Sequence, residues 1–270
     1  MKFAICNETY QGWNFESTCE HIRKTGYEGV EIAPFTLKND PRELNYQDAD
    51  KVKKAAANEG LDVVGLHWLL VKPSWLHLTT TDTLLQKDTI KFAVHLAEFC
   101  NAIGGHVMVW GSPKQRDLQP DWDYDDALAR ATDVLSQIAQ QIENLGVTIA
   151  MEPLARTETN FLTTAAETIQ LIEKVNHPAV QLHLDVKAMS DESKSIPEII
   201  KDSQKYIAHF HANDPNLRGP GFGDVQFEPI AAALKEIQYS GYVSVEVFDY
   251  SPDPETIAEK SIQYLQKTFQ

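Results

Sequence analysis

The sequence predicts an α/β protein in which eight parallel β-strands alternate with helices and close into a single-domain (β/α)₈ barrel. Apolar, strand-like segments recur from one end of the chain to the other, and amphipathic segments with helical spacing, such as 84–101 and 126–145, lie between them. Neighbouring parallel strands need a crossover of this kind. Eight such units fit the 270 residues, so we expect residues 1–270 to form one barrel of the TIM type.

The eight expected strands are short runs rich in β-branched and other apolar residues. In chain order they are 2–6, 27–33, 61–67, 106–111, 147–152, 180–186, 206–212 and 242–248. Glycines stand just before several of them, where the preceding helices are expected to end: Gly26, Gly60, Gly104, Gly146 and Gly241. An open doubly wound sheet is the alternative, but no G-x-G-x-x-G nucleotide fingerprint follows the first strand.

Composition and charge exclude several classes of protein. Hydrophobic residues make up 43% of the chain, enough for a large core, and the net charge is −15 with a pI near 5.0. Such a charge repels polyanions, so we expect neither nucleic acid nor an anionic membrane as a partner. Three widely spaced cysteines, no signal peptide and no apolar run of membrane length predict a cytoplasmic protein.

Four of the later strands carry an acid or a histidine where a buried parallel strand is normally apolar throughout. These residues are Glu152, Asp185, His211 and Glu246, at or near the ends of the last four strands. Side chains alternate between the two faces of a strand, and the opposite face of each strand is apolar, as suits the helix-covered outside of a barrel. The polar residues are therefore expected to point inward.

Three carboxylates and one imidazole that converge in this way predict a site for one divalent metal ion. Like charges at close range cannot all stay ionised without a cation between them. One nitrogen and three oxygen donors favour a hard cation, Mn²⁺ first and Mg²⁺ or Co²⁺ next, while donor type alone leaves Zn²⁺ open. A salt bridge or a water network is the alternative for each residue taken singly.

The motifs on these strands resemble those of the xylose-isomerase-like TIM barrels, a family of sugar phosphate isomerases and epimerases, and within it the ketose 3-epimerases. The matching segments are E-P-L-x-R-x-E from Glu152 to Glu158, Leu184-Asp185, H-x-H-x-x-D from His209 to Asp214, and Glu246 on the last strand. The resemblance extends from the first strand to Glu246. It implies a metal-dependent enzyme that acts on a small sugar.

The resemblance also implies roles for individual residues. Glu152, Asp185, His211 and Glu246 match the family's metal ligands, and the two glutamates among them match its catalytic acid and base. Glu158 and Arg218 match a glutamate and an arginine that contact substrate oxygens. A cation held there would stabilise an ene-diolate, so that one carboxylate can remove a proton next to a carbonyl and the other can return one.

One position departs from the pattern of the epimerases. Their strand-six aspartate usually begins a D-x-x-H motif, whereas this chain has Ala188 in place of the histidine. That histidine contacts substrate in the family, so metal binding is expected to persist while the identity of the substrate stays open. Lys187 could replace it if its side chain points inward, but a lysine on the surface of the loop is the favoured interpretation.

Further residues are expected near the barrel mouth. His67 and Trp110 should face inward on strands three and four and are candidates for substrate contact, with filling of the barrel core as the alternative. Glu31 should face inward on strand two, and His106 and His183 should lie deeper, in hydrogen-bonded core positions. Trp13 and Phe248 could stack on a sugar ring, and the loop 213–224 could close over substrate.

We therefore expect a metal-dependent isomerase or epimerase of a small ketose, keto-cyclitol or sugar phosphate. A dehydratase of an inosose or of dehydroshikimate begins with the same proton abstraction and is the alternative. An AP-endonuclease-like phosphodiester hydrolase is less favoured, because it needs additional metal ligands at positions where this chain has Ala188 and Gln226. A non-catalytic sugar-binding protein is also less favoured, because it should have lost one of the carboxylates, and none is missing. Barrels of this family often pair, so a homo-oligomer is also open.

Overall fold

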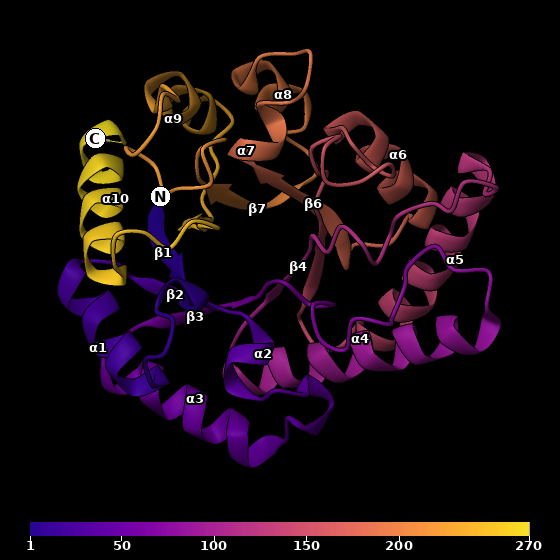
Figure 1. Ribbon diagram of the computed structural model, residues 1–270, viewed down its shortest axis with the longest axis horizontal. Coiled ribbons are helices and arrows are strands. Elements are labelled where there is room, and N and C mark those ends of the chain that lie inside the picture. The colour runs from indigo at the N-terminus through magenta and orange to yellow at the C-terminus, as the bar shows by residue number, and fades with distance from the viewer. Residues whose placement is uncertain (270) are drawn as a thin grey trace.

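Eight parallel strands form a closed barrel in sequence order in the computed structural model, which describes residues 1–269. Figure 1 shows the strands at the centre of the molecule and the helices around them. The strands are β1 (Lys2–Cys6), β2 (Gly29–Ile32), β3 (Asp62–Leu66), β4 (Val107–Trp110), β5 (Thr148–Met151), β6 (Val180–Asp185), β7 (Ile207–Ala212) and β8 (Tyr242–Val245). The predicted (β/α)₈ fold is confirmed, and every predicted strand overlaps an observed one.

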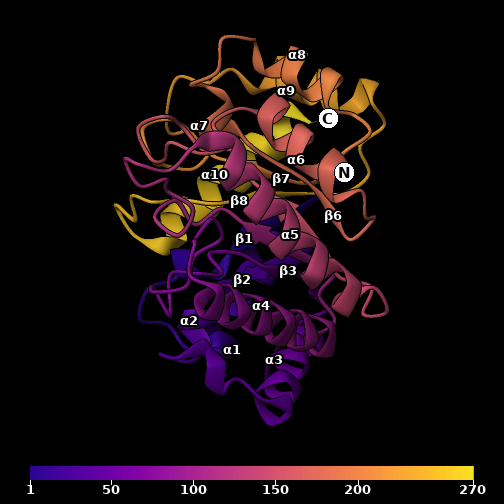
Figure 2. The same ribbon diagram turned by 90° about the vertical axis from the view of Figure 1, so that its right-hand side faces the viewer.

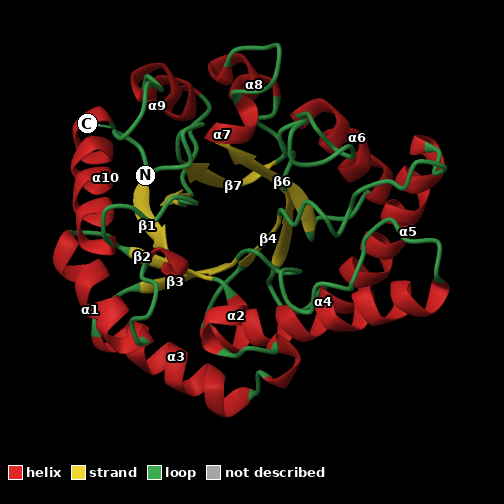
Figure 3. Cartoon of the chain, viewed as in Figure 1, coloured by secondary structure: helices red, strands yellow, loops and turns green. Residues whose placement is uncertain are grey.

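The long helices cover the outside of the barrel (Figure 3). They are α1 (Phe15–Thr25), α3 (Tyr46–Asn58), α4 (Thr83–Ile103), α5 (Tyr124–Ile142), α6 (Ala165–Val175), α8 (Ile196–Asp202), α9 (Phe227–Glu236) and α10 (Pro254–Thr268). The side view in Figure 2 shows α4 and α5 lying along the barrel wall. Within residues 1–269, none of the helices combines the length and apolar character needed to cross a membrane.

Four short helical turns interrupt the loops: η1 (Asn7–Thr9), α2 (Pro34–Leu37), η2 (Pro41–Glu43) and α7 (Val186–Met189). Three of them, η1, α2 and α7, begin within two residues of the end of a strand. The carboxyl ends of parallel barrel strands open on one face. These turns therefore place their side chains at the barrel mouth, beside the residues that end the strands.

The strands pack through two apolar layers. The larger layer joins the outward side chains of the strands to the helices, and the smaller one is a cluster of inward side chains drawn from five strands: Ala4, Val64, Val107, Ala150 and Tyr242. The remaining inward positions toward the mouth are polar. Register shifts fall between Val30 and Glu31 and between Leu182 and His183. Such irregularities re-aim side chains near functional sites.

Strands β3 and β4 approach closely because residue 65 is a glycine. A Cβ at Gly65 would overlap the carbonyl oxygen of Val107. This contact sets the position of β3 and therefore of His67, which directly follows the strand.

We predict that Gly65→Ala destabilises the protein by about 1–3 kcal/mol, because a buried overlap has to be relieved by moving backbone. Urea unfolding followed by circular dichroism measures the change. Gly60→Ala is the control: its Cβ would meet nothing within 4 Å, and only the left-handed backbone, with a φ of 67°, should cost about 1 kcal/mol. A Gly65→Ala protein as stable as the parent would contradict the proposed close approach.

Candidate metal centre and active site

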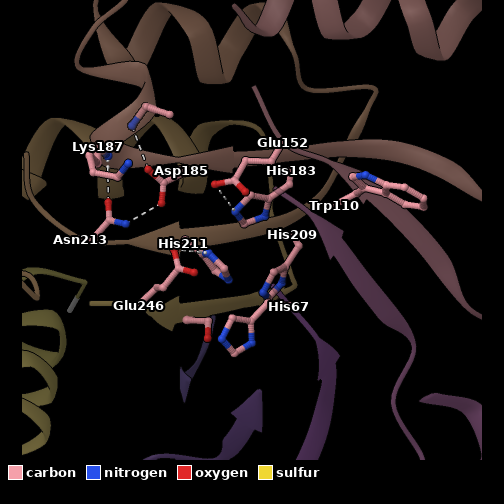
Figure 4. A network of polar contacts seen from close by, with 12 residues as sticks. His67, Trp110, Glu152, His183, Asp185, Lys187, His209, His211, Asn213 and Glu246 are labelled. Atoms are coloured by element: carbon pink, nitrogen blue, oxygen red, sulfur yellow. Dashed lines mark hydrogen bonds and ion pairs between the residues drawn. The ribbon is translucent and has the colours of Figure 1, made fainter. Parts of the chain in front are cut away.

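The four residues expected to bind metal lie together at the barrel mouth (Figure 4). Glu152 directly follows β5, Asp185 ends β6, His211 lies on β7 and Glu246 directly follows β8, and all four are buried. Glu152, Asp185 and His211, with His183, each offer a ligand atom within 4.8 Å of the others. Glu246 lies outside that tight set, but its Oε2 is 3.2 Å from Nδ1 of His211.

Asp185 is held in place by two hydrogen bonds, one from the residue after β7 and one from α7. The side-chain nitrogen of Asn213 donates to Oδ2 of Asp185 at 2.5 Å, and the backbone N–H of Ala188 donates to Oδ1 at 2.8 Å. The second bond makes Asp185 the N-cap of α7. Asn213 also accepts the backbone N–H of Lys187 through Oδ1. One amide therefore fixes both the carboxylate and the start of the helix after it.

Glu246 is held from two sides. Its Oε2 faces His211, and the indole Nε1 of Trp68 donates to its Oε1 at 2.6 Å. Trp68 has a φ of 53°, a left-handed conformation that is uncommon for a tryptophan. Its ring stacks on Phe248, with centroids 5.7 Å apart and an interplanar angle of 22°. The loop after β3 thus bends sharply to bring an indole over a candidate metal ligand.

A second group of buried, ionisable residues contacts the candidate metal ligands. Glu31 faces inward as predicted and bridges two histidines, with contacts of 2.8 Å to Nε2 of His209 and 3.0 Å to Nε2 of His211. His67 is fully buried, and its Nε2 lies 2.7 Å from Oε2 of Glu8. The bond from Nε2 of His211 to Glu31 leaves Nδ1 facing Glu246. An outer carboxylate that orients a histidine in this way is typical of metal sites.

Burial of these charges shifts their proton affinities. Burial raises the pKa of Glu152 well above its usual range, and the charges of Asp185 and Glu246 raise it further. Burial also raises the pKa of Asp185. Burial opposes ionisation of Glu246 as well, but the charge and hydrogen bond of His211 hold its pKa below the usual range. Three carboxylates in this space cannot all be ionised without more positive charge than the cluster itself supplies.

Lys187 does not lie on the surface, and the favoured interpretation of its position is wrong. Because α7 begins directly after Asp185, its first turn directs Lys187 back toward the mouth. The ammonium donates to Oε2 of Glu158 at 2.6 Å and lies 4.7 Å from the ring centroid of Phe248. Burial opposes its charge, but Asp185 and Glu158 raise the pKa of Lys187, so the group stays protonated.

A cavity of about 570 Å³ opens over the cluster. We name it the carboxylate pocket; its lining includes Glu152, Glu158, Lys187, Glu246, Gln115 and Ser112, with Trp68 and Phe248 on one side. Its size lies within the range of small-molecule sites. Both candidate catalytic carboxylates and the Lys187–Glu158 pair therefore face one cavity. His67 lies beneath it, within the polar network, and is not among its lining residues.

Two residues predicted to contact substrate, Trp110 and Arg218, do not line the carboxylate pocket. Trp110 does not point inward: it is fully buried in the apolar layer shared with the helices, and Figure 4 shows it directed away from the cluster. Arg218 is not among the residues that line the carboxylate pocket, and its Nε donates to Oδ2 of Asp249 at 2.9 Å. Its loop is tied by the buried Asp214, whose carboxylate accepts the backbone N–H groups of Asn216 and Val225.

The expectation for His183 is met in burial but not in hydrogen bonding, and the expectation for His106 is wrong. His183 is fully buried, but neither ring nitrogen has a hydrogen-bond partner, and its Nε2 lies 3.9 Å from Oε1 of Glu152. His106 is exposed rather than in the core. It directly precedes β4, whose Val107 belongs to the inward apolar cluster.

Several residues of the site were not found from the sequence. Arg116 is fully buried and donates to the backbone oxygens of Glu152 and Trp110, both at 2.6 Å, so it fixes the end of β5. Gly111 makes room for the Glu152 carboxylate, which a Cβ there would overlap. Glu8 and Asn213 complete this set. Arg116 and Asn213 lie in loops, where no periodic pattern marks an inward position.

The residues present fit a divalent cation. Buried carboxylate oxygens and imidazole nitrogens of Glu152, Asp185 and His211 converge within ligand distance of one another, and Glu246 adjoins them. His183 keeps two unpartnered nitrogens beside this space, and Gly111 leaves room for the Glu152 carboxylate. Oxygen donors with one or two imidazoles suit Mn²⁺, Mg²⁺ or Co²⁺.

Comparison with known proteins places the chain in a family. The sequence profile described as "Xylose isomerase-like TIM barrel" matches residues 19–268. The chain is 26% identical over 243 residues to D-psicose 3-epimerase of Agrobacterium fabrum, covering 85% of this chain and 78% of that protein. It is 23% identical over 271 residues to 3-dehydro-D-guloside 4-epimerase of Escherichia coli, covering 98% and 99%.

The fold agrees with this match. It superposes on the crystal structure of D-psicose 3-epimerase from Clostridium cellulolyticum H10 with D-tagatose, with a TM-score of 0.86, 20% identity and 100% of both chains covered. The resemblance first seen in the strand motifs is thereby confirmed. The chain belongs to the xylose isomerase-like TIM barrel family.

Proposed function

We propose that this protein is a divalent-metal-dependent epimerase or isomerase of a ketose, which removes and returns a proton on a carbon next to the carbonyl. One observation carries the proposal: Glu152 and Glu246, from β5 and β8, line the same pocket beside Asp185 and His211. The related D-psicose 3-epimerase and 3-dehydro-D-guloside 4-epimerase carry names that describe such an inversion.

The two glutamates are suited to opposite roles. Without a cation between them, burial and neighbouring acids raise the pKa of Glu152, while the charge of His211 lowers the pKa of Glu246, so the two carboxyl groups differ in proton affinity. Carboxyl groups whose environments separate their proton affinities are typical acid–base pairs. In our proposal one glutamate takes the proton from one face of the substrate carbon and the other returns a proton on the opposite face, which inverts that carbon.

A cation held by Glu152, Asp185, His211 and Glu246 would supply electrostatic stabilisation of the negative charge that develops on the substrate oxygens. Mn²⁺ is our first choice, with Mg²⁺, Co²⁺ or Zn²⁺ as alternatives. Arg116 and Asn213 hold the end of β5 and Asp185 in position. Trp68 and Phe248 stack on each other and line one side of the pocket.

The Lys187–Glu158 pair would bind hydroxyl groups of the substrate beside the ring of Phe248. Lys187 offers N–H donors and Glu158 offers acceptors, so the pair matches the hydroxyl groups of a sugar. We assign to Lys187 the position left by the histidine that Ala188 replaces. Arg218 and Trp110 are not part of this proposal, because neither lines the pocket.

The test of the proposed function is proton exchange in D₂O. Protein stripped of metal, and then reloaded with Mn²⁺ or Mg²⁺, is incubated with ketoses, inososes and their phosphates. NMR should detect deuterium next to the carbonyl of a ketose only in the reloaded protein, with an epimer or an isomer as product. A product that has lost a hydroxyl group would identify a dehydratase, and exchange that persists after metal removal would contradict metal dependence.

We predict that Glu246→Gln lowers kcat by about 10²–10⁴-fold, since an amide cannot accept the proton. Measurement of product formation by chromatography tests this, with Glu152→Gln expected to show a loss of similar size. Glu143→Gln, at a half-exposed surface position, is the control and should keep full activity. Full activity of Glu246→Gln would remove that residue from the mechanism.

Asn213 provides a test that leaves every candidate ligand intact. We predict that Asn213→Ala weakens metal binding about 10–100-fold, because Asp185 then loses the hydrogen bond that orients it. Isothermal titration of the metal-free protein with Mn²⁺ measures the affinity. Asn216→Ala removes an exposed amide from the same loop and should bind Mn²⁺ like the parent. Equal affinities in the two variants would contradict the orienting role.

A further inference from the structure

A second cavity adjoins the carboxylate pocket. It measures about 620 Å³, and we name it the aromatic pocket because its lining includes Tyr10, Trp13, Phe15, Phe35 and Tyr250. Trp68 and Phe248 line both cavities. Each cavity alone has the volume of a small-molecule site. Together they offer more room than one small ketose would fill.

The wall between the two pockets is a row of aromatic rings. Trp68 lies between Phe35, at a centroid distance of 5.9 Å, and Phe248, at 5.7 Å. The three rings come from the loops after β2, β3 and β8. Since Trp68 also donates to Glu246, the wall touches one of the candidate catalytic carboxylates directly. A ligand in the aromatic pocket would therefore lie next to the reacting centre.

Glu8 supplies an unused hydrogen-bond acceptor in the aromatic pocket. It is only 4% exposed; its Oε2 contacts His67, whereas its Oε1 has no hydrogen-bond partner. A buried carboxylate oxygen without a partner is costly and calls for a donor. Glu8, His67 and Glu246 also offer atoms within 4.8 Å of one another, so the Glu8 carboxylate lies beside the candidate catalytic group.

The chemistry of the aromatic pocket selects a neutral, hydroxyl-rich ring. Aromatic rings pack against the C–H faces of a sugar, and a carboxylate accepts its hydroxyl groups. Among the described residues that line the pocket, Glu8 is the only charged one. A phosphate or a carboxylate would meet no positive side chain among the described residues that line this pocket and would lie beside the Glu8 carboxylate. The pocket therefore disfavours a sugar phosphate as the occupant.

We propose that the aromatic pocket binds a second, uncharged sugar ring, so that the preferred substrate is a glycoside carrying a ketone rather than a free monosaccharide. The ketone-bearing unit lies in the carboxylate pocket, against Glu152 and Glu246, and the second ring lies against Trp13 and Tyr10, with a hydroxyl group donated to Glu8. This inference rests on the proposed function for the reacting half only. The binding of the second ring can be measured without turnover.

The test compares D-fructose with maltulose and isomaltulose, in which the same ketose carries a glucosyl group on one or another hydroxyl. Binding to the metal-loaded protein is followed by tryptophan fluorescence, and turnover by NMR. We predict that at least one glucosyl ketose binds about tenfold more tightly than fructose and has a correspondingly higher kcat/KM. Trp13→Ala should remove this preference, and Trp13→Phe, which keeps an aromatic ring, should retain most of it.

Trp75→Ala is the matched control, because Trp75 is exposed and lines a different cavity, beside α4. It should leave the ratio of the two affinities unchanged. Glucosyl ketoses that bind no better than fructose would overturn the inference. A Trp13→Ala variant that weakens the binding of fructose and of the glucosyl ketoses equally would also overturn it, because the aromatic pocket would then hold the far end of a single ring. Tighter binding of maltulose, with no proton exchange in any ketose tested, would support the second-ring site while rejecting the proposed function.

Discussion

The burial of several carboxylates inside one barrel mouth is the constraint on which the rest of the site depends. Glu152, Asp185 and Glu246 are almost without solvent contact. Without positive charge nearby, burial and their mutual repulsion would favour the protonated, neutral form of these carboxyl groups. The protein supplies part of the compensation through His211 and Lys187. The remainder is what a divalent cation would provide.

The neighbouring residues make sense as supports for this buried charge. Arg116 is fully buried, yet its guanidinium binds backbone oxygens at the ends of β4 and β5 rather than a carboxylate. Burial lowers the pKa of Arg116 to about 10, so it remains charged beside Glu152 at neutral pH. Glu31 performs the equivalent task for His209 and His211. The candidate metal ligands are thus held by groups that contact them on the side away from the carboxylate pocket, and their side facing the pocket stays free.

The fold and the convergence of Glu152, Asp185, His211 and Glu246 could be predicted because the two faces of β5 to β8 differ in chemistry. An acid or a histidine on one face and aliphatic residues on the other leave only one way for the strand to pack. The same argument failed for Trp110, because both faces of β4 are apolar and alternation alone does not say which one is inward. The inward residue there is Val107, in contact with the central apolar cluster.

Other parts of the site lie outside any regular pattern. Lys187 is on a four-residue helix that begins where β6 ends, and so short a helix has no detectable period. Glu8 follows β1 on a 3-10 turn, although extending the inward alternation of Ala4 and Cys6 by one step would have reached it. The indole of Trp68 reaches Glu246 only because its backbone is left-handed, which no propensity predicts.

The most direct measurement of the central claim is anomalous diffraction at the manganese edge from crystals of the protein grown with Mn²⁺. Our account predicts one peak of anomalous density between the carboxylates of Glu152, Asp185 and Glu246 and the imidazole of His211. The absence of a peak at this position, or a peak only at surface carboxylates, would show that the buried cluster is neutralised by protons and histidines alone and would contradict the account.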